Sequence, residues 1–159
     1  MEYTKEGVRV DPCRHGLGVF ALRSLITGDV MGPIQGEIVA DRDYGSEFAI
    51  DLGDRALEPA APFRFLNHSC RPNCELVICE EEDEDGTPRD PTVWLDILSE
   101  IAAGEPMTID YAWPAKEAIP CQCGTASCRG WIVAEENLDE VRAAQHGSLA
   151  ALDSACRDR

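Results

Sequence analysis

The chain has 159 residues, 44% of them hydrophobic, which suits a globular domain with a core of its own. Its 30 acidic and 14 basic side chains give a formal net charge of −16, which disfavours nucleic-acid binding because phosphate contacts need Lys and Arg. The same charge attracts basic partners by long-range steering, or serves only to keep the chain soluble.

The first half of the chain is expected to form short β-strands broken by glycine. The predicted strands cover residues 8–10, 18–21, 30–34, 37–39 and 48–52, with a turn at 14–17. Further along, 75–79 and 93–97 predict a β-hairpin. Because like charges cannot pack together, the acidic run at 80–85 is expected to be the hairpin loop, either simply solvated or steering a basic substrate.

The chain after Trp131 is expected to be helical, because Leu138, Val141, Leu149 and Leu152 lie near helical spacing. Gly and Ser at 147–148 can end one helix and cap another. This tail is expected to be structural, or to form an oligomer contact.

The sequence also bears on the compartment. No apolar run approaches the ~20 residues that span a bilayer, and the first residues are not typical of a signal peptide. A soluble intracellular protein with no membrane partner is therefore expected, cytoplasmic if the source is bacterial and with the nucleus as the alternative otherwise.

Eight cysteines in a reducing compartment indicate a metal site rather than disulfides. Cys121, Cys123 and Cys128 form a C-x-C-x4-C cluster. Three thiolates leave a tetrahedral zinc ion one ligand short. Cys70 is the best candidate for the fourth ligand because it lies in the other dense cluster of the chain, at 67–74.

Cys74 and Cys79 are alternatives for the fourth position, and free buried thiols are the alternative to any metal site. Cys13 and Cys156 are expected to be incidental. Zinc held by four thiolates has no open position, so it would hold the fold and would not activate water. Such binding contributes on the order of 10 kcal/mol in small peptides, so the C-terminal segment is expected to be ordered only when zinc is bound.

Three further motifs each have an ordinary explanation when taken alone. Gly16-Leu17-Gly18 lets a backbone approach a ligand closely, but a plain turn explains it equally well. His68 beside Cys70 could be a base beside a nucleophile, which is disfavoured because the metal uses Cys70 better. The Asn67-His68 pair is more typical of binding something polar, and Tyr111 alone is a half-buried strand tyrosine.

Together these motifs resemble the SET-domain protein lysine methyltransferases with a zinc-binding post-SET segment. Residues 16–19 are similar to the family's glycine motif, and 64–74 to its most specific motif. Residues 101–111 are similar to its catalytic tyrosine motif, and 121–130 to its post-SET segment. The four motifs occur in the family's order, and the resemblance covers roughly residues 7 to 132.

The resemblance implies a mainly β fold with short helices: small curved β-sheets threaded as a pseudoknot, plus a helical C-terminal tail. It implies a SET domain at 1–118, a zinc-binding post-SET segment at 119–132 and the tail at 133–159. The pseudoknot would bring the Asn-His segment beside the tyrosine strand.

The resemblance also implies the activity and its residues. S-adenosylmethionine would donate a methyl group to a substrate lysine, and Tyr111 would be catalytic. The residues implied in donor binding are Gly16, Leu17, Gly18, Arg64, Asn67, His68 and Trp131. The implied zinc ligands are Cys70, Cys121, Cys123 and Cys128, and the zinc would tie the C-terminal loop to the Asn-His segment.

Two residues depart from the family pattern. Phe48 stands where many relatives have tyrosine, which removes a hydroxyl from the substrate channel or the donor site. Ile109 lies two residues before Tyr111, where relatives often have Phe or Tyr and where side-chain size tunes how many methyl groups fit. An aliphatic residue leaves more room, so dimethylation or trimethylation is expected.

Three functions remain to be distinguished. The first is methylation of a lysine in a basic protein, either a histone tail or another basic protein. The second is a non-catalytic SET-like module, stapled by zinc, that binds basic peptides. The third is a zinc interaction module that binds no donor.

Overall fold

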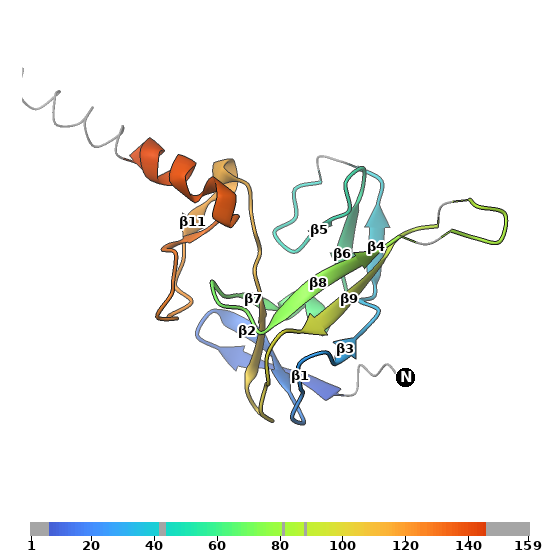
Figure 1. The fold of residues 1–159 in the computed structure, drawn as a ribbon, viewed down its shortest axis with the longest axis horizontal. Helices are drawn as coiled ribbons and strands as arrows, with labels where there is room; N and C mark the ends of the chain where they lie inside the picture. The colour runs from blue at the N-terminus through green and yellow to red at the C-terminus, as the bar shows by residue number, and fades with distance from the viewer. Residues whose placement is uncertain (1–6, 42–43, 81, 88, 146–159) are drawn as a thin grey trace, which may run out of the picture. The chain divides into compact units, whose positions relative to one another are not determined.

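The structure, a computed structural model, describes residues 7–41, 44–80, 82–87 and 89–145 (Figure 1). Its strands are β1 Val8–Cys13, β2 Gly16–Ala21, β3 Val30–Met31, β4 Gly36–Val39, β5 Ile50–Asp51, β6 Ala56–Pro59, β7 Asn67–His68, β8 Cys74–Cys79, β9 Thr92–Ile97, β10 Pro106–Ile109, β11 Ile119–Pro120 and β12 Trp131–Ile132. Its 3-10 helices are η2 Phe63–Phe65, η3 Ala115–Glu117 and η4 Glu135–Asn137. Within the described residues the α-helix runs over 138–145. The predicted mainly β fold with short helices is confirmed.

The chain divides into two compact units. The first comprises residues 1–67 and 72–109, and the second comprises residues 68–71 and 110–159. The chain therefore passes from one unit to the other three times, after Asn67, after Arg71 and after Ile109. The short segment from His68 to Arg71 belongs to the same unit as the C-terminal part of the chain, although some forty residues separate the two in sequence.

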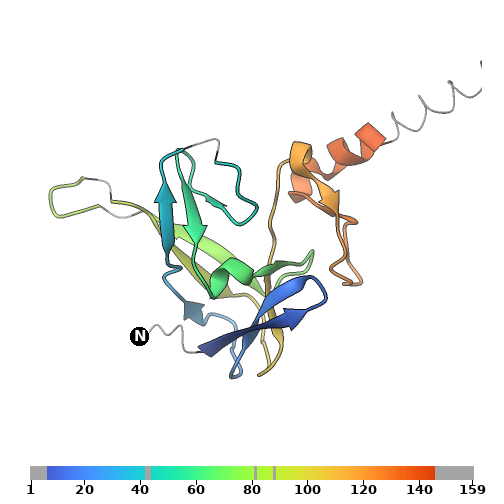
Figure 2. The same cartoon turned by 180° about the vertical axis from the view of Figure 1, so that it is seen from behind.

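Three small sheets are built from strands of the first unit, in the strand orders β1-β2-β10-β7, β3-β9-β8 and β4-β6-β5. The exception is His68, the second residue of β7, which belongs to the second unit. The strand order sets β7 beside β10, so the Asn-His segment joins the strand that leads to Tyr111, as the expected threading requires. Helix η2 precedes β7 and can be followed in Figure 2. The core combines residues from all parts of the unit: Val19, Leu25, Leu57, Leu95, Ile97, Ile101 and Met107.

The first hairpin is longer than predicted. β1 and β2 are antiparallel and pair from Val8 with Ala21 to Cys13 with Gly16, so the turn contains only residues 14–15. The predicted turn at 14–17 was therefore too long, because residues 16–17 belong to β2. Gly16 adopts a φ of +99°, which favours glycine, and this lets the strand start directly after the turn.

The predicted hairpin of 75–79 and 93–97 is confirmed as β8 and β9, which pair from Cys74 with Ile97 to Cys79 with Thr92. The described part of the loop between them is held by one acidic side chain. Asp83 Oδ1 accepts hydrogen bonds from the N–H groups of Asp85, at 3.0 Å, and of Thr87, at 2.9 Å. The acidic run thus includes a side chain that folds its own loop.

Two predicted strands are shorter in the structure. The strand expected at 30–34 ends at Met31, because Gly32 has a φ of +127° and leaves the extended conformation. The strand expected at 48–52 is reduced to β5, and Phe48 lies in a turn in which its N–H donates to Ser46 Oγ at 3.2 Å. A local side-chain hydrogen bond here competes with strand pairing, which the alternation of apolar residues does not reveal.

Gly36 begins β4 opposite Pro59 of β6 and has no room for a side chain. A Cβ atom at this position would lie 2.2 Å from the carbonyl oxygen of Glu58. Because a backbone atom cannot move aside cheaply, we expect Gly36→Ala to lower the free energy of unfolding by about 1–3 kcal/mol or more. Gly45→Ala is the matched control, since no atom lies within 4 Å of its Cβ position. Urea denaturation of both variants checks this, and equal midpoints would contradict it.

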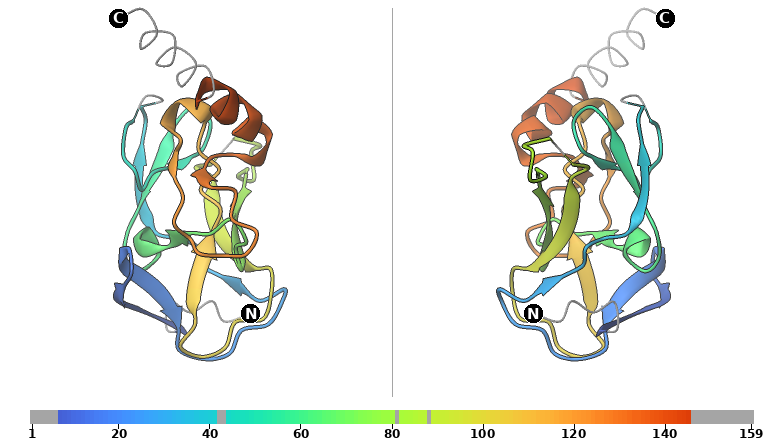
Figure 3. Two further views of the ribbon diagram at one scale, coloured as in Figure 1. Left: turned by 90° about the vertical axis from the view of Figure 1, so that its left-hand side faces the viewer. Right: turned by 90° about the vertical axis from the view of Figure 1, so that its right-hand side faces the viewer.

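The second unit contains the C-terminal part of the chain (Figure 3). β11 and β12 pair in antiparallel register, Ile119 with Ile132 and Pro120 with Trp131. η4 leads into the α-helix, whose Val141 is buried, as are Val133 and Ala134. Leu149, Leu152, the 147–148 cap and Cys156 lie outside the described residues. The described chain has no helix with the length and apolar character needed to cross a membrane.

Candidate functional site

The glycine motif and Asn67 meet within the first unit. The Asn67 side-chain amide donates a hydrogen bond to the carbonyl oxygen of Leu17 at 2.8 Å and another to Cys13 Sγ at 3.5 Å. Gly18 is buried beneath this contact, and a Cβ there would lie 3.1 Å from Asn67 Nδ2. A side chain at this position would push the amide away by a few tenths of an ångström, so glycine favours its close approach.

Arg64 and Phe48 form a separate group in the same unit. The Arg64 guanidinium lies over the Phe48 ring, 4.1 Å from its centroid, and donates to Glu58 Oε1 at 2.7 Å. The second carboxylate oxygen of Glu58 is buried without a hydrogen-bond partner in the described structure. Arg64 is thus already paired with a carboxylate of the protein itself.

Asn73 fastens the chain after the Asn-His segment to β10. Its Nδ2 donates to the carbonyl oxygen of Pro106 at 2.9 Å, and its Oδ1 accepts from the N–H of Thr108 at 2.8 Å. The Asn73 side chain thereby makes the two backbone hydrogen bonds that a neighbouring strand would make with β10. Ile109, the next residue, is buried with 8% of its surface exposed.

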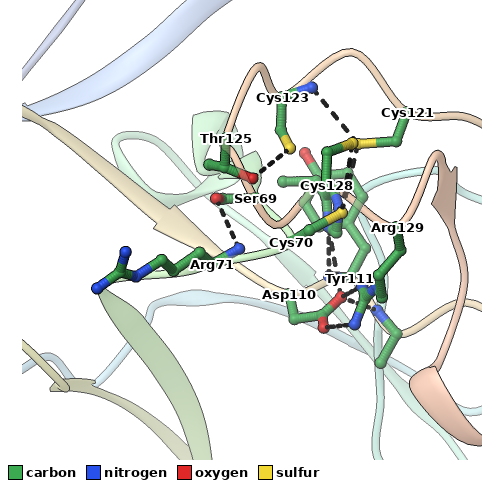
Figure 4. Close-up of polar contacts among 12 residues, drawn as sticks. Ser69, Cys70, Arg71, Asp110, Tyr111, Cys121, Cys123, Thr125, Cys128 and Arg129 are labelled. Carbon is green, nitrogen blue, oxygen red and sulfur yellow. Dashed lines mark hydrogen bonds and ion pairs between the residues drawn. The ribbon is translucent and has the colours of Figure 1, made fainter.

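In the second unit, His68 accepts a hydrogen bond from the backbone of Tyr111, which lies beside Asp110 (Figure 4). The Tyr111 N–H donates to His68 Nδ1 at 3.2 Å, so the proton of the neutral ring resides on Nε2, which lies 3.4 Å from Cys70 Sγ. Burial lowers the pKa of His68, against the attraction of the Asp110 carboxylate, and the ring is therefore neutral near pH 7. The Tyr111 ring packs against Trp113, with 5.3 Å between ring centroids.

Asp110 and Arg129 form a bidentate ion pair beside these residues. Arg129 Nη1 and Nη2 donate to the two Asp110 oxygens at 2.6 Å and 2.7 Å. Burial alone would raise the pKa of Asp110, but the hydrogen bonds from Arg129 hold it below its usual range. The carboxylate is therefore ionised at neutral pH and stays paired.

The four predicted metal ligands come together in the second unit. The sulfur atoms of Cys70, Cys121, Cys123 and Cys128 all lie within 4.8 Å of one another. Cys70 Sγ is 3.6 Å from Cys121 Sγ and 4.0 Å from Cys128 Sγ. A tetrahedral ion with metal–sulfur bonds of about 2.3 Å requires sulfur atoms about 3.8 Å apart, so the cluster fits a zinc ion.

The thiols of this cluster differ in the direction in which their pKa is shifted. Burial raises the pKa of Cys70 and of Cys121. Burial acts in the same direction on Cys123, but hydrogen bonds from Thr125 and from backbone groups outweigh it and lower the pKa of that thiol to about 6. A metal ion would supply the charge that lets the remaining thiols ionise in a buried position.

The alternatives for the fourth ligand lie elsewhere. Cys74 is fully buried in β8 of the first unit, and burial raises the pKa of its thiol to about 12. Cys79 ends the same strand. Neither belongs to the four-sulfur group, so the geometry selects Cys70.

The predicted donor and channel residues divide between the units. Those in the first unit are Gly16, Leu17, Gly18, Phe48, Arg64, Asn67 and Ile109. Those in the second are His68, Tyr111 and Trp131, together with the four cysteines. Trp131 is half-buried in β12, where it follows the cysteine loop directly.

Sequence reasoning assigned no role to three residues that, each within its own unit, contact or adjoin predicted site residues. Cys13, expected to be incidental, contacts Asn67, while Asp110 and Arg129 pair beside Tyr111. Asp110 and Arg129 each adjoin a residue already singled out, Tyr111 and Cys128. Opposite charges next to two predicted site residues are the signal that could have suggested the pair.

Comparisons with known proteins agree with this geometry. Residues 16–112 match the family model described as the SET domain. A Schizosaccharomyces pombe histone-lysine N-methyltransferase, H3 lysine-4 specific, is 30% identical over an alignment of 146 positions, which covers 80% of this chain and 15% of the relative. The Arabidopsis thaliana histone-lysine N-methyltransferase ASHR3 is 30% identical over an alignment of 142 positions, which covers 79% of this chain and 27% of the relative. The chain thus spans only a small part of these relatives.

A solved structure shares the fold. The crystal structure of KRYPTONITE in complex with mCHG DNA and SAH superposes with a TM-score of 0.63, at 22% identity, over 79% of this chain and 28% of that chain. The matched family model covers more than half of the chain and includes the glycine motif, the Asn-His segment and Tyr111. The protein therefore belongs to the SET-domain family.

Proposed function

We propose that the protein is a protein-lysine N-methyltransferase that uses S-adenosylmethionine as methyl donor and a basic protein as substrate. The observation that carries this proposal is the hydrogen bond from the Tyr111 N–H to His68 Nδ1, which joins the family's most specific motif to its tyrosine motif. The named activity of the relatives, histone-lysine methylation, supports it. We assign to the predicted site residues the roles that the resemblance implies.

The donor supplies a methyl group on a positively charged sulfur, which a neutral amine can attack. A free lysine has a pKa near 10.4, so deprotonation near pH 7.5 costs about 4 kcal/mol. A dry channel lowers that pKa, and we assign Phe48 and Ile109 to its wall. The Tyr111 hydroxyl orients the amine nitrogen, and positioning of this kind supplies much of the rate enhancement.

We assign donor binding to the backbone at residues 16–18 and to Asn67 and His68, with Trp131 against the adenine. Arg64 is paired with Glu58. It would therefore stabilise the donor carboxylate either at a distance, by its charge, or directly, by exchanging Glu58 for that carboxylate. The sulfur cluster would hold a structural zinc ion. We propose a SET domain at 1–118, a zinc-binding segment at 119–132 and a tail at 133–159, with Cys70 of the SET domain as the fourth ligand of the zinc ion.

The net charge of −16 supports a basic protein substrate and disfavours direct nucleic-acid binding. A histone tail and another basic protein both satisfy this chemistry. A histone substrate would place the protein in the nucleus, whereas another substrate is compatible with the cytoplasm. Self-association through the C-terminal helix is the proposed oligomer contact.

Ile109 is expected to permit more than one methyl transfer. Its branched aliphatic side chain is smaller than the aromatic residues common at this position in the family, which leaves room for a methylated amine. We expect dimethyl or trimethyl product from the wild-type protein, and a shift to monomethyl product in Ile109→Phe. Mass spectrometry after exhaustive turnover checks this, and strictly monomethyl product from the wild type would contradict it.

The test of the proposed function is transfer of radiolabelled methyl groups from S-adenosylmethionine to core histones and to a source lysate, with products identified by mass spectrometry. Donor binding should be measured by calorimetry in parallel. Donor binding without transfer would favour the non-catalytic peptide-binding module. Absence of donor binding would favour a zinc interaction module.

A further inference from the structure

Arg129 connects the cysteine cluster to the segment that carries Tyr111, and all of these residues lie in the second unit (Figure 4). It directly follows Cys128, one of the four clustered cysteines. The next residue, Gly130, donates its N–H to Cys128 Sγ at 3.4 Å. The backbone at Arg129 is therefore fixed by the metal-ligand loop.

The Arg129 side chain points from this loop to Asp110. It is only 12% exposed, and both of its terminal nitrogens are used, at 2.6 Å and 2.7 Å from the two carboxylate oxygens. A planar guanidinium bound in this way fixes both the distance and the orientation of the carboxylate. Lysine, a point charge, would hold Asp110 less firmly.

Asp110 in turn shapes the backbone that follows Tyr111. Its Oδ1 accepts the N–H of Ala112 at 3.1 Å, while the Tyr111 N–H itself donates to His68 Nδ1. Ala112 has a φ of +47°, in the left-handed region that residues other than glycine rarely adopt. Such a conformation persists only where its surroundings enforce it, and the Asp110 side chain is the group that closes this turn.

We propose that Arg129 is a positioning residue for Tyr111. Arg129 holds Asp110 in place, so an ordered cysteine cluster keeps the segment that carries Tyr111 ordered as well. This inference rests on the proposed function for Tyr111. It predicts that the metal and the donor still bind without the guanidinium, whereas the Tyr111 backbone loosens and the chemical step slows. An ion pair with a purely structural role would lower thermal stability and leave Tyr111 order and turnover unchanged.

The test compares Arg129→Met, Arg129→Lys and Asp110→Asn. Arg142→Met is the matched control, because Arg142 pairs with Asp139 at 3.6 Å on the described helix while 54% of its side chain is exposed. Five quantities are measured on the wild-type chain and on each variant: bound zinc per chain, the exchange rate of the Tyr111 amide by NMR, kcat, KM and donor affinity.

Arg129→Met should keep its zinc, exchange the Tyr111 amide about tenfold faster or more, and lose roughly 10- to 100-fold in kcat with a much smaller change in donor affinity. Asp110→Asn should behave alike, Arg129→Lys should fall between, and Arg142→Met should match the wild type. Unchanged Tyr111 exchange and kcat in zinc-loaded Arg129→Met would overturn the inference. Loss of zinc in that variant would also overturn it, since Arg129 would then act on the metal site.

The two proposals fail in different ways. If the wild-type protein transfers no methyl group, the proposed function fails, while the amide-exchange measurement still decides whether Arg129 orders Tyr111. If the wild type is active and Arg129→Met resembles the control, only the positioning role fails.

Discussion

Tyr111→Phe should lose methyl transfer by about two orders of magnitude or more while retaining donor affinity. The change removes one oxygen atom and keeps the ring that packs on Trp113 and the backbone N–H that binds His68. The fold of the second unit should therefore survive. What disappears is the hydroxyl that we propose orients the amine and stabilises charge during transfer. An effect confined to the transition state lowers kcat, so kcat should fall. Single-turnover transfer of a radiolabelled methyl group, with donor binding by calorimetry, measures both quantities.

Tyr44→Phe is the matched control for this experiment. Tyr44 lies in the first unit and is 37% exposed, and its substitution also removes a single phenolic oxygen. It should leave both transfer and donor binding unchanged. Near-normal turnover in Tyr111→Phe would remove Tyr111 from its proposed role, and equal losses in both variants would point to a general effect on the fold.

The cysteine cluster shows what the sequence predicts well. Three thiols in one short loop are best explained by a shared metal ion. The one other dense cluster of the chain offers the fourth ligand. The structure brings Cys70 to the other three sulfurs across about fifty residues of chain. The hairpin of β8 and β9 was predicted for a similar reason, because alternating apolar residues flank an acidic run that cannot be buried.

Features that depend on a single tertiary contact were not predicted. The Asp110–Arg129 pair joins residues nineteen apart that look, in sequence, like ordinary surface charges. Asn73 resembles a motif residue, but its role in pairing with β10 follows only from where that strand lies. The shortening of the strand at Phe48 reflects one serine hydroxyl, and the end of β3 reflects one backbone angle at Gly32. Periodicity carries no information about either.

The division into two units could not be predicted from the sequence either. The chain leaves the first unit for only four residues, 68–71, and this excursion supplies both His68 and Cys70 to the second. No change of composition marks it, because the excursion is shorter than any window over which composition can be read. It explains why the specific motif at 64–74 is so dense: successive residues serve two different units.

Removal of zinc should unfold the second unit and weaken donor binding. Its buried apolar side chains in the described residues are few, Val133, Ala134 and Val141, and its elements are a two-residue strand pair and short helices. Zinc bound by thiolates is worth on the order of 10 kcal/mol, which exceeds what so small a core supplies. Chelation should therefore expose the chain from Asp110 onward to protease, and it should lower donor affinity because His68 is anchored beside Cys70.

Cys128→Ser should reproduce the effect of the chelator, whereas Cys79→Ser should not, because Cys79 lies at the end of β8 in the first unit and outside the four-sulfur group. The informative comparison is between zinc content and the proteolysis of each unit. If zinc leaves while the second unit stays resistant and donor affinity is unchanged, its fold does not depend on the metal. If Cys79→Ser also releases zinc, the ligand assignment is wrong. A selective loss of the second unit, with the strands of the first still protected, is the result expected from a metal that holds together a unit assembled from two distant stretches of chain.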